Sequence, residues 1–248
     1  MQQKKKNGNP VRSTKFVSVA AKDTPFAYSE AYKALRTNLG FLTNVSGVRS
    51  VLITSAVPEE SKSTTAINLA ITLASSGKSV VLVECDLRKP VLRKYLKREL
   101  GKSGLAAYLA GLVGLDDCIV DLNDLGISVI GAGVIPPNPS ELLNCDRMGD
   151  LIETLKLNFD YVLLDAPPVT VVTDAAVVGP KTDGALLVVR SKFASARTVR
   201  QAKSRLESVG VRILGGVLTR FNMRKSGWRG GYDYKNYEYG YGMNKGKR

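Results

Sequence analysis

The segment from residue 50 to residue 74 restricts the possible folds of this chain more than any other stretch. It reads SVLITSAVPEESKSTTAINLAITLA. The β-branched run at 51–54 is typical of a buried strand, and the apolar positions between 66 and 73 recur with helical spacing. The loop between them ends in Lys62 and Ser63. A strand, a loop and a helix that begins with Lys-Ser predict a phosphate-binding loop.

The chemistry of such a loop gives its residues distinct roles. The free backbone N–H groups of the first helical turn attract an anion, Lys62 adds positive charge for the β- and γ-phosphates, and the Ser63 hydroxyl is placed for Mg²⁺. ATP and Mg²⁺ are therefore the expected cofactors. The full pattern G-x-x-x-x-G-K-[ST] is not matched, because Ala56 and Ser61 stand at the two glycine positions. The residues expected to bind the nucleotide are Pro58, Glu59, Glu60, Ser61, Lys62, Ser63, Thr64 and, from a later segment, Arg88.

Two further buried strands end in carboxylates. Residues 79–85 (SVVLVEC) include Glu84 and precede Asp86, and residues 159–164 (FDYVLL) precede Asp165. In an open parallel sheet, ligands bind at the carboxyl ends of the strands, and a hard cation takes oxygen ligands. The sequence therefore predicts that Asp86 and Asp165 hold Mg²⁺ together with the loop hydroxyl. An edge charge and a helix-start acid are the structural alternative for Glu84 and Asp86.

The rest of the chain alternates between extended and helical patterns. Strands are expected at 127–130, 185–190 and 211–218, and helices at 29–39, 103–110, 141–157 and 195–209, with Ser29 as a candidate N-cap. This alternation implies an α/β fold, a P-loop NTPase-like parallel sheet covered by helices on both faces. Three parts are expected: a flexible basic arm (1–24), one P-loop domain (25–219) and a disordered tyrosine-rich tail (220–248).

Composition excludes several kinds of protein. The 248 residues suffice for one α/β domain. The sequence contains no histidine, which excludes Ser-His catalysis and His-ligated zinc. No apolar run approaches the ~20 residues that span a bilayer. Three scattered cysteines do not make a disulfide framework, so we expect a reducing, cytoplasmic compartment.

The net charge of +14 lies mostly at the two ends of the chain. Residues 1–15 contain five basic and no acidic residues, and residues 220–248 contain eight basic and two acidic ones. A DNA-binding protein carries its basic face on the folded domain, whereas basic tails suit an anionic inner membrane surface or an acidic partner. The charge distribution therefore argues against a DNA-binding face on the folded domain. Solvated tails that aid solubility are the alternative.

The C-terminal segment is rich in tyrosine. Few aliphatic residues accompany the tyrosines, so the segment cannot form a core. One interpretation of these tyrosines is phosphorylation, which would add about −1.5 to −2 charges per site. Two others remain open at this point: the tyrosines stack on single-stranded nucleic acid, or the tail has no specific role. The tyrosines within ten residues are Tyr232, Tyr234, Tyr237, Tyr239 and Tyr241.

A polar pattern near the N-terminus also has two interpretations. Glu30, Lys33 and Arg36 recur every three residues on the polar side of the expected helix. They form either a solvated face with internal ion pairs or a strip that pairs with acids of a neighbouring subunit.

Four motifs and the tail together resemble a known family. In order, SAVPEESKSTTAINLA, VVLVECDLRKP, PPNPSELL, DYVLLDAPP and the tyrosine-rich C-terminus are similar to the bacterial tyrosine kinases of capsule and exopolysaccharide synthesis. The similarity covers residues 26–241. Each motif alone would also fit the wider group of P-loop ATPases of the MinD/ParA type. The lysine that those ATPases carry early in the loop is absent here, with Val57 in its place.

The resemblance implies an ATP-dependent protein-tyrosine kinase that phosphorylates the tail tyrosines between subunits. Lys62 and Ser63 match the Walker A lysine and hydroxyl, Glu84 and Asp86 the two acids of the Walker A′ motif, and Asp165 the Walker B aspartate. Lys62, Glu84, Asp86 and Asp165 are thus the expected catalytic residues. One carboxylate near Asp86 or Glu84 would accept the proton of the tyrosine.

The resemblance also implies partners. Glu30, Lys33 and Arg36 match the strip through which such kinases form homo-oligomeric rings, with Lys33 in place of an arginine. A membrane-spanning activator, a chain-length-determinant protein, supplies a short cytoplasmic segment, and this chain resembles the type whose activator is a separate chain. We further expect a tyrosine phosphatase as partner, no nucleic-acid partner, and a place at the inner face of the cell membrane. The expected role is to regulate capsule or exopolysaccharide synthesis and export.

Three departures from the family pattern lie near the nucleotide. Glu59 and Ser61 stand where family loops have glycine, which permits φ > 0. Glu84 replaces an aspartate, and Thr219 and Arg220 stand where relatives often have asparagine near the base. Two other functions therefore remain: a MinD/ParA-like ATPase without transfer to protein, and a pseudokinase scaffold that has lost ATP.

Overall fold

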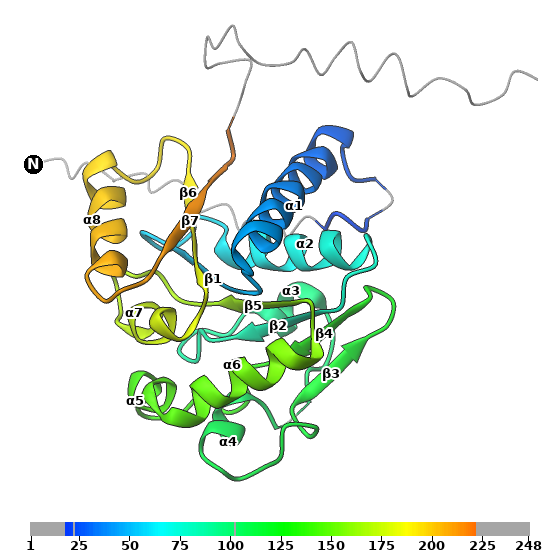
Figure 1. The fold of residues 1–248 in the computed structure, drawn as a ribbon, viewed down its shortest axis with the longest axis vertical. Coiled ribbons are helices and arrows are strands. Elements are labelled where there is room, and N and C mark those ends of the chain that lie inside the picture. Colours follow the sequence, from blue (N-terminus) through cyan, green and yellow to red (C-terminus); the bar gives the residue numbers. More distant parts are fainter. Residues whose placement is uncertain (1–17, 22, 102, 222–248) are drawn as a thin grey trace, which may run out of the picture.

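A seven-stranded sheet runs through the domain with helices on both sides (Figure 1). The computed structural model describes residues 18–21, 23–101 and 103–221, and the expectations for the basic arm up to residue 17 and for the tail from residue 222 lie outside them. Within the described residues, no helix has the length and apolar character needed to cross a membrane. The expected α/β class is confirmed.

The elements follow one another in the expected alternation. The helices are α1 (Phe26–Ser46), α2 (Lys62–Ala74), α3 (Leu92–Leu96), α4 (Leu105–Leu109), α5 (Pro139–Asn144), α6 (Asp146–Asn158), α7 (Asp174–Val178) and α8 (Ala196–Glu207). The strands are β1 (Ser50–Ser55), β2 (Val80–Glu84), β3 (Ile119–Leu122), β4 (Ile127–Ile130), β5 (Tyr161–Asp165), β6 (Gly184–Arg190) and β7 (Ile213–Thr219).

The order of the strands across the sheet is β3-β4-β2-β5-β1-β6-β7. All neighbours are parallel except β3 and β4, which are antiparallel. The sequence does not predict β3, because three of its four residues are at least partly exposed and leave no buried run. β5 lies between β2 and β1, so the strands that end in the predicted acids and in the phosphate loop are direct neighbours.

β1, β2 and β5 are buried along their whole length because helices cover both faces of the sheet. On one face, Val51 of β1 belongs to a cluster with Leu39 of α1 and Ile67 of α2. On the other face, Leu52 belongs to a second cluster with Leu151 of α6 and others from α4, α7 and α8. Successive strand residues thus point to opposite layers, as the pleat of a strand requires.

Two helix predictions are wrong in their boundaries. α1 begins at Phe26 directly after Pro25, so Ser29 lies inside the helix and is not its N-cap. The region 141–157 forms two helices, because Cys145 takes an extended backbone (φ −61°, ψ 158°) between α5 and α6. Pro139 is the first residue of α5, a position where its missing N–H is not needed. The sequence analysis predicts α4 within the helix expected at 103–110, but it does not predict α3 and α7.

Candidate functional site

The loop between β1 and α2 (residues 56–61, the phosphate loop) has the backbone of a glycine-containing loop without its glycines. Glu59 has φ 66°, and Ser61, the residue before α2, has φ 73°. Both values lie in the left-handed region, where a residue with a Cβ atom costs roughly 1–2 kcal/mol. These are the two positions at which the family resemblance leads us to expect glycine, whereas Ala56, the other departure from the general pattern, has no positive φ. The loop therefore keeps the expected course at the expense of local strain.

Glu60 supports the strained loop from within. It is 1% exposed, and its Oε2 accepts hydrogen bonds from the N–H groups of Ala56 (2.9 Å) and Val57 (3.0 Å). Its Oε1 accepts from the N–H of Arg190 at the end of β6 (3.1 Å). The sequence predicts Glu60 among the nucleotide-binding residues, whereas the structure directs its carboxylate to the backbone of the protein itself.

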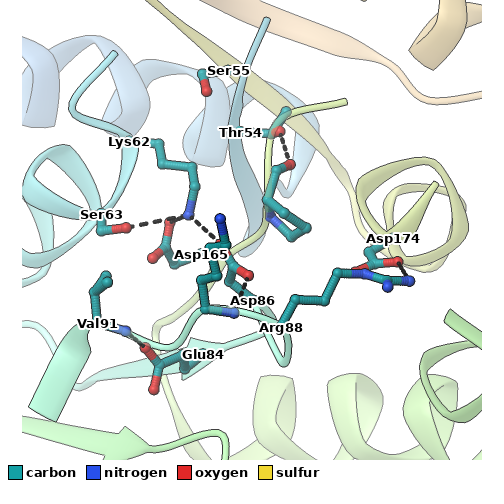
Figure 2. A network of polar contacts seen from close by, with 12 residues as sticks. Thr54, Ser55, Lys62, Ser63, Glu84, Asp86, Arg88, Val91, Asp165 and Asp174 are labelled. Atoms are coloured by element: carbon teal, nitrogen blue, oxygen red, sulfur yellow. Dashed lines mark hydrogen bonds and ion pairs between the residues drawn. The ribbon is translucent and has the colours of Figure 1, made fainter. Parts of the chain in front are cut away.

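Lys62, Asp86 and Asp165 meet at the carboxyl ends of β1, β2 and β5 (Figure 2). The Lys62 ammonium nitrogen Nζ lies 3.1 Å from Asp86 Oδ2 and 3.4 Å from Asp165 Oδ1. The Ser63 hydroxyl oxygen is 3.3 Å from the same nitrogen. Asp86 and Asp165 are both buried. The structure thus brings together four residues that the sequence predicts for catalysis and Mg²⁺ binding.

Burial and charge act against each other in this cluster. Desolvation acts to lower the pKa of Lys62, but the negative charges of Asp165 and Asp86 outweigh it, so that the pKa is raised. Burial raises the pKa of Asp165, against the opposing effects of the Lys62 charge and of a hydrogen bond with Ser63. Lys62 therefore remains an ammonium at neutral pH, the form that attracts a polyphosphate.

The donor set fits a hard cation. Asp165 Oδ2 is buried and lacks a hydrogen-bond partner, a condition that is costly unless a ligand satisfies the atom. With Asp86 and the Ser63 hydroxyl, it offers oxygen atoms only, which suits Mg²⁺. The described residues contain no group of three or more His, Cys, Asp or Glu side chains that could hold a metal. Mg²⁺ would therefore take its remaining oxygens from water and phosphate.

Glu84 does not face the cluster. Its Oε1 accepts hydrogen bonds from the N–H groups of Val91 (2.5 Å) and Leu92 (2.7 Å), and its Oε2 accepts from Ala132 N–H (3.2 Å). Burial raises the pKa of Glu84, although these three bonds oppose the shift. The side chain joins the start of α3 to the segment after β4. The sequence predicts a catalytic carboxylate here, but the geometry gives Glu84 a structural task.

Arg88 extends away from Lys62 toward Asp174 (Figure 2). Its Nε lies 2.9 Å from Asp174 Oδ2, and its Nη2 donates to Ser140 Oγ (2.8 Å). Asp174 is fully buried and also accepts a hydrogen bond from the Ser140 hydroxyl. The sequence predicts that Arg88 binds the nucleotide. In the structure Arg88 lines the cleft beside Lys62, while its guanidinium joins the segment after β2 to the starts of α5 and α7. Asp174 and Ser140 give no local sequence signal for this role.

A cleft of about 360 Å³ opens beside Lys62 and Asp86. Its first side is the phosphate loop with the start of α2. The residues of this side are Pro58, Glu59, Ser61, Lys62, Ser63 and Thr64, all predicted to bind the nucleotide. Its second side is apolar, and we call it the apolar wall. The residues of the apolar wall are Val91, Tyr95, Pro167, Pro168, Val171 and Val172. Three charged residues, Asp86, Arg88 and Lys89, complete the lining of the cleft.

The predicted interface strip lies on α1. Lys33 is exposed and pairs with Glu30 within the helix (Nζ to Oε1, 2.7 Å). Arg36 is partly buried, and its Nη1 donates to the C=O of Thr72 in α2 (3.2 Å). Arg36 therefore helps to attach α1 to α2. The five predicted acceptor tyrosines lie outside the described residues.

Thr219, one of the two residues near the expected base site, contacts the phosphate loop. Its hydroxyl donates to the C=O of Glu60 (3.0 Å). The ends of β6 and β7 are thus both attached to this loop, through Glu60. Arg220 follows with φ 52°.

Comparison with known proteins places the chain in a family. The family model described as CobQ/CobB/MinD/ParA nucleotide binding domain matches residues 51–230. Tyrosine-protein kinase YwqD of Bacillus subtilis (strain 168) is 35% identical over 207 residues, which cover 84% of this chain and 87% of YwqD. The solved kinase domain of Escherichia coli tyrosine kinase ETK is 36% identical, with a TM-score of 0.77 over 89% of this chain and 87% of that domain.

A more distant structure shares the fold. The septum site-determining protein MinD from Pyrococcus horikoshii OT3, complexed with Mg-ADP, has a TM-score of 0.60 at 24% identity, over 68% of this chain and 69% of MinD. The order of the motifs, the geometry of the site and the similarity to these proteins all indicate the same family. The chain belongs to the CobQ/CobB/MinD/ParA nucleotide-binding family and, within it, to the bacterial tyrosine-protein kinases.

Proposed function

We propose that this protein is an ATP-dependent protein-tyrosine kinase that phosphorylates its own C-terminal tyrosines between subunits and regulates capsule or exopolysaccharide synthesis and export. The observation that carries this proposal is the convergence of Lys62, Asp86 and Asp165 at the cleft beside the phosphate loop. Membership of the bacterial tyrosine kinases supports the choice of tyrosine as acceptor.

The residues of the cluster divide the work of phosphoryl transfer. The Lys62 ammonium and the first N–H groups of α2 neutralise the β- and γ-phosphates. Mg²⁺, when held by Ser63, Asp86 and Asp165, would stabilise the charge of the transferred phosphoryl group. Asp86 lines the cleft and Glu84 does not, so we assign to Asp86 the proton of the incoming tyrosine hydroxyl.

The tail and the α1 strip support a switch between assembled and separate subunits. We propose Tyr232, Tyr234, Tyr237, Tyr239 and Tyr241 as the phosphate acceptors. Their phosphorylation would cancel the positive charge of the tail and release a ring that forms through α1. Within the strip, exposed Lys33 is available to a neighbour, whereas Arg36 is bound to α2.

Two partners and a position in the cell complete the proposal. A membrane-spanning activator supplies a cytoplasmic segment, a tyrosine phosphatase reverses the modification, and the basic ends of the chain favour a peripheral position at the anionic inner face of the membrane. The family resemblance supports the two partners, and the charge distribution supports the position at the membrane.

Two other functions have specific support. The fold shared with MinD in its Mg-ADP complex favours an ATPase without transfer to protein, and the non-glycine residues at positive φ favour a pseudokinase. The first would hydrolyse ATP and form no phosphotyrosine. The second would show no stabilisation by Mg-ATP, and Lys62→Ala would behave like the wild type.

An anti-phosphotyrosine blot tests the proposal. The purified protein is incubated with Mg-ATP, with and without the activator segment, as wild type, as Lys62→Ala and with all five tail tyrosines changed to phenylalanine. We expect phosphotyrosine in the wild type only, because the first variant lacks the phosphate-binding ammonium and the second lacks acceptors. A wild type that stays unmodified with the activator refutes the kinase function.

A further inference from the structure

We infer that the apolar wall of the cleft binds the phenol ring of the acceptor tyrosine, and that Val171 and Val172 are specificity-determining residues for tyrosine. This inference rests on the proposed kinase function and adds the place where the acceptor side chain lies. The occupant is a tyrosine side chain from the tail of a second copy of this chain.

The two sides of the cleft suit two different ligands. The phosphate loop side presents Lys62, Ser63 and the start of α2, which are groups for a triphosphate. The prolines and valines of the apolar wall have no side-chain hydrogen-bond donors, and the N–H groups of Val171 and Val172 already donate to the C=O of Pro168. A phosphate placed against these residues would lose its hydration without compensation. A flat aromatic ring, which buries roughly 150–250 Å² in a protein environment, is well matched to such a surface.

The wall is fixed in place before any ligand arrives. The Thr54 hydroxyl donates to the C=O of Pro167 (2.7 Å), and the N–H of Val169 donates to the C=O of Ser55 (3.0 Å). The Thr170 hydroxyl donates to the C=O of Ala56 in the phosphate loop (2.5 Å). The segment 167–172, which carries four of the six wall residues, is therefore attached to β1 and to the phosphate loop. A rigid wall lowers the entropic cost of acceptor binding.

Burial differs along the wall in the way an acceptor subsite requires. Pro167 and Pro168 are buried and form its base, while Val172 is half-buried and Val171 is 58% exposed. Water covers the Val171 side chain in the free protein, and a docked ring would remove it from water. The exposed end of the wall thus gains most when an aromatic side chain enters.

The same arrangement selects against serine and threonine. The hydroxyl of tyrosine lies at the far end of the ring, so a ring placed on the wall can present its oxygen to Asp86, which lines the same cleft. A serine or threonine hydroxyl is attached to Cβ, and it would reach Asp86 only if the peptide backbone entered the cleft. Neither side chain would cover the wall.

Steady-state kinetics of the full chain with the activator segment test this inference. The probe is a synthetic peptide of residues 232–242, and the variant is Val171→Ala combined with Val172→Ala. We expect the KM for the peptide to rise roughly tenfold, equivalent to about 1.4 kcal/mol, and to rise more than the KM for ATP. Val171→Ile with Val172→Ile should stay near the wild type because the wall remains apolar. Leu157→Ala, at an 87% exposed site on α6, is the matched control.

The outcomes distinguish a failure of this inference from a failure of the proposed kinase function. A peptide KM that is equal in the wild type and the double alanine variant, or that changes as much in Leu157→Ala, overturns this inference and leaves the kinase function intact. A wild type that phosphorylates neither the peptide nor its own tail overturns the proposed function and this inference together. If the double variant does not fold, Val171→Ala alone gives the test, because that side chain is exposed and contributes little to the core.

Discussion

Replacement of Ser61 by glycine is expected to stabilise the folded protein and to tighten nucleotide binding. Ser61 is held at φ 73°, where a residue with Cβ costs roughly 1–2 kcal/mol. Glycine removes this strain, and the greater freedom of the unfolded chain takes back about 0.5–1 kcal/mol. The Ser61 side chain makes no capping hydrogen bond to α2 that the substitution would lose. The net gain in the free energy of unfolding is therefore about 0–1.5 kcal/mol, with the middle of that range near 0.7 kcal/mol.

Urea unfolding and Mg-ATP titration measure the two effects. Ser61→Ala is the matched control, because it removes the hydroxyl and keeps the Cβ atom, and it should bring no gain in stability. Lys97→Gly is the second control: Lys97 has φ 54° at the end of α3 and does not line the cleft, so its gain in stability should leave nucleotide affinity unchanged. The reasoning is refuted if Ser61→Gly destabilises the protein, or if Ser61→Ala stabilises it equally.

Three further substitutions test the supports of the site. Glu60→Ala should cost at least about 2 kcal/mol of stability, because it leaves three backbone N–H groups without their acceptor, and should raise the KM for ATP; a nucleotide KM unchanged by this variant would contradict the support role. Glu84→Ala should lower the free energy of unfolding by a similar amount in urea and weaken nucleotide binding far less than Lys62→Ala does. A loss of nucleotide binding as large as that of Lys62→Ala would contradict a structural role for Glu84. Asp183 accepts hydrogen bonds from the N–H groups of Arg49 and Ser50 (2.8 Å each), which overcome the opposing effect of desolvation and lower its pKa. Its contribution is therefore complete above the unfolded pKa of about 3.9 and lost as the pH falls through the lower folded pKa. Asp183→Asn should then destabilise the protein at pH 7 and have little effect near pH 2, and a difference that does not change with pH would contradict this.

The amino-acid sequence alone is enough to predict the strand–loop–helix around Lys62 and the acids at the ends of two buried strands. Both are local patterns: a β-branched run, a helical spacing, and a carboxylate that directly follows an apolar run. The convergence of Asp86 and Asp165 on Lys62 also follows from sequence, because parallel strands bring their carboxyl ends to one edge of the sheet. The position of β5 between β1 and β2 then makes the three ends neighbours.

The contacts of each charged side chain in these motifs depend on the packing of the whole chain and could not be predicted from the motifs. Glu60, Glu84 and Arg88 occupy motif positions, yet their partners come from segments 3 to 130 residues away in the sequence. A buried carboxylate must be satisfied, and the nearest backbone N–H groups are set by chain packing and not by the motif. The apolar wall likewise combines the segments after β2 and β5, whose residues show no common pattern in the sequence. Sequence thus identified the phosphate-binding chemistry, while folding determined which acids serve it and which hold the loops.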